Sequence, residues 1–143
     1  MLYELIYHSL ADNDLTTQEI GDILEKSRQF NGRHSVTGCL LCYQSEFLQI
    51  LEGEKETVLA LYNKIAEDPR HSHLVILGQG EITHRVFEHW TMGFQDYTDY
   101  QLNENTSMSI EELTALMKNL SNTTKARKLF SSIAGNLIAG KFT

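Results

Sequence analysis

Residues 45–53 read SEFLQILEG, an apolar stretch with a glutamine at its centre. The apolar side chains predict a buried strand, and Gly53 is a plausible end for it. A buried amide group has N–H donors and an acceptor oxygen to satisfy, and leaving them unpaired costs on the order of 1–3 kcal/mol. Gln49 is therefore expected either on an exposed face or opposite another polar group.

On both sides of this stretch the sequence predicts strands and helices in the order β-α-β-β-α-β, followed by an additional strand. Thr16 and Glu19 fit a capping box at the start of the first helix, and Asn31-Gly32 is expected to end it. The order is that of an α+β, ferredoxin-like sandwich, in which two helices cover one face of a mostly antiparallel sheet. Strands are expected at 2–8, 35–43, 46–52, 73–79 and 92–97, and helices at 16–30 and 54–67.

The last third of the chain has a different pattern. A polar linker at 99–108 precedes two amphipathic stretches, near 110–120 and 126–137. The alternation along the strands leaves Ile6, Leu48 and Ile50 on the face that the main helices do not cover. We expect the two C-terminal helices to pack on this far face, with a partner protein or a second copy of the chain as the alternative. This divides the chain into a sandwich domain at 1–98 and a helical cap at 99–143.

Composition restricts the class of function. A chain of 143 residues with 41% hydrophobic and 22% charged residues fits one globular domain. A formal net charge of −7 argues against binding to nucleic acid or to an anionic membrane, since both need a basic surface. No apolar run is long enough to span a bilayer, and the N-terminus has no signal-peptide pattern. We expect a cytoplasmic protein.

Cys39 and Cys42 have the CxxC spacing of some metal and redox sites. On a strand, residues three apart point to opposite faces, so these two thiols could not share a metal ion or form a disulfide with each other. We expect two buried free cysteines. The six histidines form no metal-binding motif, and no metal site is expected.

Several polar side chains are predicted to converge on the helix-covered face. Tyr7 and Gln49 can meet there if their strands are neighbours, and Ser27 and Asn31 lie one turn apart on the helical stripe that includes Ile23. The residues alone leave two interpretations open. One is a buried hydrogen-bond network, and the other is a pocket for a planar, mostly apolar ligand with polar groups at its edge.

The sequence resembles the BLUF domains, a family of blue-light sensors that use flavin. The resemblance covers residues 2 to about 97, with the motifs in unbroken order. They are LIYHS (5–9), SRQFN (27–31), VTGCLLCY (36–43), FLQILEG (47–53), DPRHSHLVIL (68–77) and RVFEHWTM (85–92).

The resemblance implies a role for each matching polar residue near the flavin. Tyr7 matches the photoactive tyrosine, and Gln49 matches the glutamine that bridges this tyrosine and the flavin ring. Asn31 matches an asparagine that bonds the pyrimidine edge of the ring. Ser27 matches a pocket position less firmly tied to function, and Ile23 is grouped with it.

The resemblance also implies roles for four residues further along the chain. Arg70 and His71 match residues near the phosphate end of the ligand, where a positive group suits an anion. Trp90 and Met92 match a pair whose positions change with signalling state, and either of the two could face the flavin. The implied cofactor is FAD, the usual form in the family, with FMN or riboflavin as alternatives.

The function implied by the resemblance is that of a photoreceptor, and with the sequence ending at Thr143 we expect no output enzyme. Excitation would rearrange the hydrogen bonds of Tyr7 and Gln49, and the signal would pass through the sheet and the C-terminal helices to an unidentified protein partner. A homo-oligomer is also expected. The alternatives are a flavin-dependent redox enzyme, an acylphosphatase-like hydrolase on the same fold, and an interaction module that has lost its ligand. The sequence carries no glycine-rich phosphate loop that would favour an enzyme.

Overall fold

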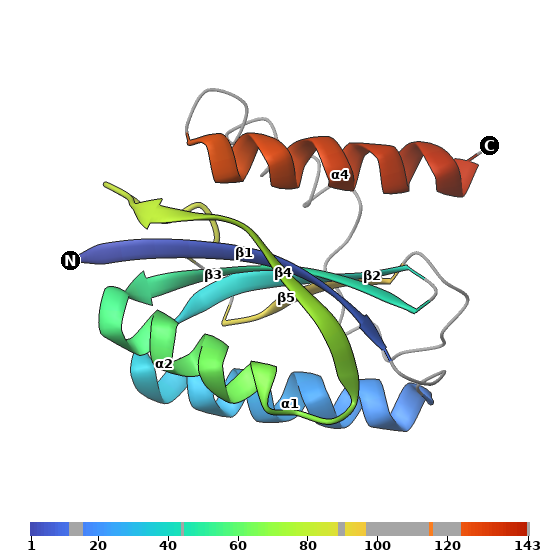
Figure 1. Ribbon diagram of the computed structural model, residues 1–143, viewed down its shortest axis with the longest axis horizontal. Coiled ribbons are helices and arrows are strands. Elements are labelled where there is room, and N and C mark those ends of the chain that lie inside the picture. Colours follow the sequence, from blue (N-terminus) through green and yellow to red (C-terminus); the bar gives the residue numbers. More distant parts are fainter. Residues whose placement is uncertain (12–15, 44, 89–90, 97–114, 116–123, 143) are drawn as a thin grey trace.

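The computed structural model describes residues 1–11, 16–43, 45–88, 91–96, 115 and 124–142. A five-stranded sheet forms the middle layer, with α1 and α2 on one side and α4 on the other (Figure 1). The strands are β1 (Leu2–Ala11), β2 (Thr37–Tyr43), β3 (Glu46–Glu54), β4 (His71–Glu81) and β5 (Gly93–Asp96), and the helices are α1 (Thr17–His34), α2 (Lys55–Ala66) and α4 (Lys125–Phe142).

The strand order is β4-β1-β3-β2-β5. The first four strands pair antiparallel, and β5 adds to the edge at β2 in parallel. The predicted α+β, ferredoxin-like fold with an additional strand is therefore confirmed. The two central strands, β1 and β3, carry the tyrosine and the glutamine singled out in the sequence.

The first helix begins as predicted and ends later. The Thr16 side chain accepts a hydrogen bond from the Glu19 backbone N–H, and Glu19 completes the capping box. The prediction that Asn31-Gly32 ends the helix is wrong, because the helix runs on to His34. Ser35 ends it instead, in a left-handed conformation with φ 56°, and its backbone N–H bonds the Asn31 carbonyl. For this reason β2 begins at Thr37 rather than at residue 35.

The two faces of the sheet carry separate apolar clusters, as the strand alternation predicts. The face under α1 and α2 includes Tyr7 and Leu51, and the far face includes Ile6, Leu48 and Ile50. α4 covers the far face with three buried apolar side chains, those of Ala126, Phe130 and Ala134. The prediction is thus confirmed for the second C-terminal helix. The first, at 110–120, lies almost wholly outside the described residues, as does the boundary at residue 98.

The two cysteines are buried on opposite faces. Cys39 belongs to the far-face cluster and Cys42 to the helix-side cluster, and both are free thiols, as predicted. Within the described part of the chain, no helix combines the length and the apolar character needed to cross a membrane.

Candidate functional site

Tyr7 and Gln49 face each other across the central strand pair. They are direct partners in the β1–β3 register, and the Tyr7 hydroxyl donates a hydrogen bond to Gln49 Oε1. Both side chains are buried, with exposed fractions of 3% and 4%. Gln49 Nε2 donates to the sulfur of Met92 at 3.2 Å. The glutamine in the apolar stretch is thus satisfied by a phenol on one side and a thioether on the other.

A cavity of about 360 Å³ lies beside this pair, bounded by the sheet, α1 and α2. The size is within the range of small-molecule sites, and most of the lining is apolar. Of the residues singled out in the sequence, Tyr7, Ile23, Ser27, Gln49, Arg70 and His71 all line it. Sequence reasoning missed eight further lining residues as site residues: Lys26, Phe30, Leu40, Phe47, Leu61, Lys64, Ile65 and Asp68.

Asn31 is buried next to this site, although it does not itself line the cavity. Its Nδ2 donates to the Thr91 carbonyl at 2.6 Å, and Thr91 directly precedes Met92, which bonds Gln49. Its Oδ1 is buried and has no hydrogen-bond partner among the described residues. An unpaired buried acceptor is costly, so this atom fits a donor that a bound molecule would supply.

Burial keeps Tyr7 in its neutral form. It raises the pKa of the phenol far above its ordinary value of 10.0, and the nearby Tyr62 and Asp68 raise it further. The ring of Tyr62 packs edge-on against Tyr7, with 5.4 Å between the ring centroids. The Tyr7 hydroxyl therefore keeps its proton at neutral pH and donates it in the hydrogen bond to Gln49.

Positive groups gather along the rim of the cavity. Arg70 forms an ion pair with Asp68, whose pKa the hydrogen bonds from Arg70 hold below its usual range. Lys26 and Lys64 line the same rim and leave it net positive together with Arg70. These two lysines are part of the site that sequence reasoning missed. Their only sequence signal is helical spacing, Lys26 from Phe30 and Lys64 from Leu61.

His71 is held in a defined tautomer beside Tyr7. Its Nε2 lies 2.7 Å from the Ile65 carbonyl oxygen, which only accepts, so Nε2 carries the ring proton. Nδ1 lies 2.9 Å from the Ser9 hydroxyl and shares a hydrogen bond with it. The imidazole thus forms one wall of the cavity, and the lysines and Arg70 supply positive charge at its rim.

The family model described as "Sensors of blue-light using FAD" matches residues 2–93 of this chain. The chain belongs to the BLUF family. Photoactivated adenylate cyclase subunit beta of Euglena gracilis is 33% identical over 92 residues, which is 64% of this chain and 11% of that protein. The blue light- and temperature-regulated antirepressor BluF of Escherichia coli K12 is 39% identical over 77 residues, 54% of this chain and 19% of that protein. The chain thus spans only a small part of the length of these curated relatives.

Solved structures agree with this assignment to the BLUF family. BlrB, a BLUF protein in its dark state, superimposes with a TM-score of 0.69 at 25% identity, over 96% of each chain. The ground state of BlsA gives a TM-score of 0.66 at 26% identity, over 88% of this chain and 93% of that one. A bacterial light-regulated adenylyl cyclase gives 0.66 at 37% identity, over 85% of this chain and 34% of that one.

BLUF domains bind a flavin, and the residues of this chain fit one. The cavity offers apolar walls for a planar ring, and the buried Asn31 Oδ1 next to it lacks a donor, which a ring N–H group would supply. The positive rim suits a phosphate group.

Met92 is the only one of the two predicted signalling residues whose position is described. Its side chain is 1% exposed and bonds Gln49, and its backbone carbonyl accepts from Arg28 Nε at 3.1 Å and Nη2 at 2.9 Å. Met92 therefore lies inside, against the glutamine of this BLUF domain. Trp90 lies outside the described residues.

Proposed function

We propose that this BLUF chain senses blue light through FAD bound in the cavity, with Tyr7 and Gln49 as the residues that change state. The observation that carries the proposal is the buried Tyr7–Gln49–Met92 series of hydrogen bonds beside the cavity. When bound, a flavin supplies absorption of blue light and, once excited, an oxidant for a nearby phenol.

In this proposal the cofactor is held by three kinds of contact. The Asn31 Oδ1 accepts from a ring N–H group, and apolar side chains such as Ile23 and Phe30 exclude water from the ring. The phosphate groups lie toward Lys26, Lys64 and Arg70, because these are the cations on the rim. Ser27 lines the same wall of α1 and would contact the ring or its side chain.

Tyr7 and Gln49 then form a reversible switch. The neutral Tyr7 phenol donates to Gln49 Oε1 in the dark, while the Gln49 amide N–H group is engaged by Met92. Tyr7 would give up one electron and its hydroxyl proton to the excited flavin and then take both back. In between, the Gln49 amide would be free to rotate or change tautomer, so that it donates where it accepted before. No stable covalent bond forms, and the original hydrogen bonds return in the dark. Because the amide leaves Met92, this step also changes the contacts of the segment before β5.

The switch is tested by Gln49→Leu in the flavin-bound protein. A leucine cannot exchange hydrogen bonds, so we expect the variant to bind flavin but to lose the red shift of its absorption bands under blue light. Gln79→Leu is the matched control, because Gln79 accepts a hydrogen bond from Tyr3, also on β1, at 2.9 Å but lies outside the cavity. The control should keep the shift. An unchanged shift in Gln49→Leu would exclude this mechanism.

The finer parts of the proposal concern cofactor, partner and location. The description of the family favours FAD, whereas one similar solved structure, Klebsiella pneumoniae BlrP1, is a complex with FMN. Chromatography of the cofactor released from the purified protein distinguishes FAD from FMN and riboflavin. We also propose a protein partner, a homo-oligomer and a cytoplasmic location. The acidic composition favours a protein as the partner over a nucleic acid or a membrane surface.

A further inference from the structure

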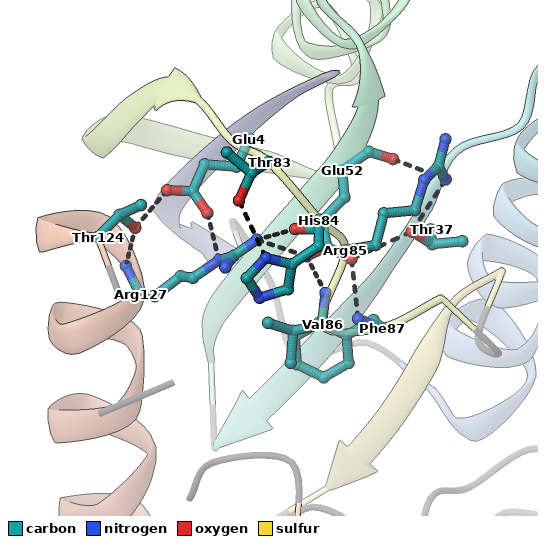
Figure 2. A network of polar contacts seen from close by, with 10 residues as sticks. All are labelled: Glu4, Thr37, Glu52, Thr83, His84, Arg85, Val86, Phe87, Thr124 and Arg127. Atoms are coloured by element: carbon teal, nitrogen blue, oxygen red, sulfur yellow. Dashed lines mark hydrogen bonds and ion pairs between the residues drawn. The ribbon is translucent and has the colours of Figure 1, made fainter. Parts of the chain in front are cut away.

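Two carboxylates and one guanidinium are buried together between the sheet and α4 (Figure 2). Glu4, Glu52 and Arg127 have exposed fractions of 1%, 0% and 1%. Arg127 Nε donates to Glu4 Oε1 at 2.8 Å, and its Nη2 lies 3.5 Å from Glu52 Oε2. The same Nη2 donates to the His84 carbonyl at 2.6 Å. We refer to Glu4, Glu52 and Arg127 as the Arg127 cluster.

The two carboxylates of this cluster would repel each other without Arg127. Glu4 and Glu52 are direct partners in the β1–β3 register, and like charges in this position destabilise a strand pair. Glu52 is anchored by the backbone N–H groups of Val86 and Phe87, at 2.8 and 2.9 Å. Glu4 has no such backbone anchor among its described contacts and is bonded by Arg127 and by the Thr124 hydroxyl at the start of α4. The position of Glu4 therefore depends on α4.

The strand pair that holds the Arg127 cluster is the one that holds Tyr7 and Gln49. On β1, Tyr7 lies three positions after Glu4, and on β3, Gln49 lies three positions before Glu52. Residues three apart on a strand point to opposite faces, so the Tyr7–Gln49 pair and the Glu4–Glu52 pair lie on opposite faces of the sheet. A shift or a change in twist between β1 and β3 at Tyr7 and Gln49 changes the separation of Glu4 and Glu52. Arg127 bonds both carboxylates at once, so the position of α4 depends on the distance between Glu4 and Glu52.

The side chains described for α4, those of residues 125–134, make a limited set of other contacts with the far face, with Ile133 partly buried among them. Among its described side chains, Phe130 packs edge-on against Phe87 with 6.1 Å between the ring centroids, and the remaining buried apolar ones are alanines. Gly78 of β4 allows the close approach, because a Cβ atom there would lie 2.7 Å from Ala126 Cβ. The Arg127 cluster is thus a large share of the described contacts that position residues 125–134 of α4.

We propose that the Arg127 cluster couples the Tyr7–Gln49 pair to α4, and that light weakens its contacts and loosens the helix from the far face. This inference rests on the proposed function and adds the residues through which the signal leaves the sheet. Arg127 is a positioning residue in this scheme, since it touches neither the cavity nor the predicted cofactor.

The test is hydrogen exchange of the backbone amides of residues 125–134 in the flavin-bound, full-length protein, in the dark and under blue light. We expect light to speed their exchange by roughly 5- to 150-fold, the range typical of coupling between two sites. Arg127→Met should exchange at the fast rate already in the dark and keep its absorption shift. Lys128→Met, which removes an exposed positive charge from the same helix, should behave as the parent protein.

The outcomes separate the inference from the proposed function. A parent protein that shows the absorption shift but exchanges these amides equally fast in dark and light would overturn the inference and leave the sensor intact. A parent protein without the shift would overturn the proposed function itself. Should Arg127→Met fail to fold, Gly78→Ala tests the same point, since it pushes α4 off the sheet without touching a charge. It should raise exchange in the dark with the shift preserved, and slow, parent-like exchange would count against the inference.

Discussion

Asn31 provides a test in which stability of the flavin-free protein and affinity for the flavin should respond differently. The perturbation is Asn31→Leu, which keeps the side chain close in size and removes both polar atoms. The change deletes the hydrogen bond from Nδ2 to the Thr91 carbonyl, worth about 0.5–1.5 kcal/mol. It also removes the buried, unpaired Oδ1, whose burial costs about 1–3 kcal/mol.

These two contributions oppose each other in the flavin-free protein. Thr91 lies at the surface, so its carbonyl can bond water after the substitution. We therefore expect the free energy of unfolding of the flavin-free variant to stay within about 1 kcal/mol of the parent or to rise. In the flavin-bound protein the Oδ1 contact is lost outright, which weakens FAD binding by roughly 5- to 150-fold at about 1.4 kcal/mol per factor of ten.

The assay combines urea unfolding of the flavin-free protein with a titration of FAD followed by its fluorescence. Gln29→Leu is the matched control, because Gln29 is an exposed amide on the same helix, two residues away. The control should bind FAD as the parent does. If Asn31→Leu binds FAD with parent affinity and loses more than about 2 kcal/mol of stability, Asn31 is a structural residue only, and its unpaired oxygen has no part in binding the flavin.

Two further predictions concern stability. The raised pKa of Tyr7 means that folding favours the neutral phenol, so its contribution to the free energy of unfolding is complete below pH 10 and is lost as the pH rises above the unfolded pKa of 10.0. The urea midpoint of the parent should therefore fall more steeply between pH 8 and 11 than that of Tyr7→Phe, and equal slopes would contradict this. Gly38→Ala should prevent normal folding, because the new Cβ would overlap the Ile50 carbonyl oxygen in the adjacent strand; a circular dichroism melt matching that of the parent would refute the register of β2 against β3.

The fold and the centre of the site follow from local patterns in the sequence. Alternation along two strands places Tyr7 and Gln49 on one face, and the ferredoxin-like order of the elements makes β1 and β3 neighbours. Both faces of the sheet are apolar, which predicts a cover on the far side, and α4 provides it. These features follow from patterns of apolar and polar side chains that repeat along the chain, so they can be predicted without a structure.

The features that sequence reasoning missed have different physical causes. Asn31-Gly32 is a common helix end, but helix packing and the left-handed Ser35 override it. Arg127 pairs with Glu4, 123 positions earlier, and only the docked position of α4 brings the two together. Lys26 and Lys64 reach the rim of the cavity through long side chains on exposed helix positions, where a lysine is normally solvated.

The most direct test of the light-driven switch is the absorption spectrum of the purified protein before blue light, after it, and during recovery in the dark. We predict a flavin spectrum whose bands move slightly to the red and return in the dark without loss of intensity. A flavin spectrum that bleaches or stays in place would contradict the switch at Tyr7 and Gln49. A colourless protein that cannot be loaded with FAD would contradict the cofactor site.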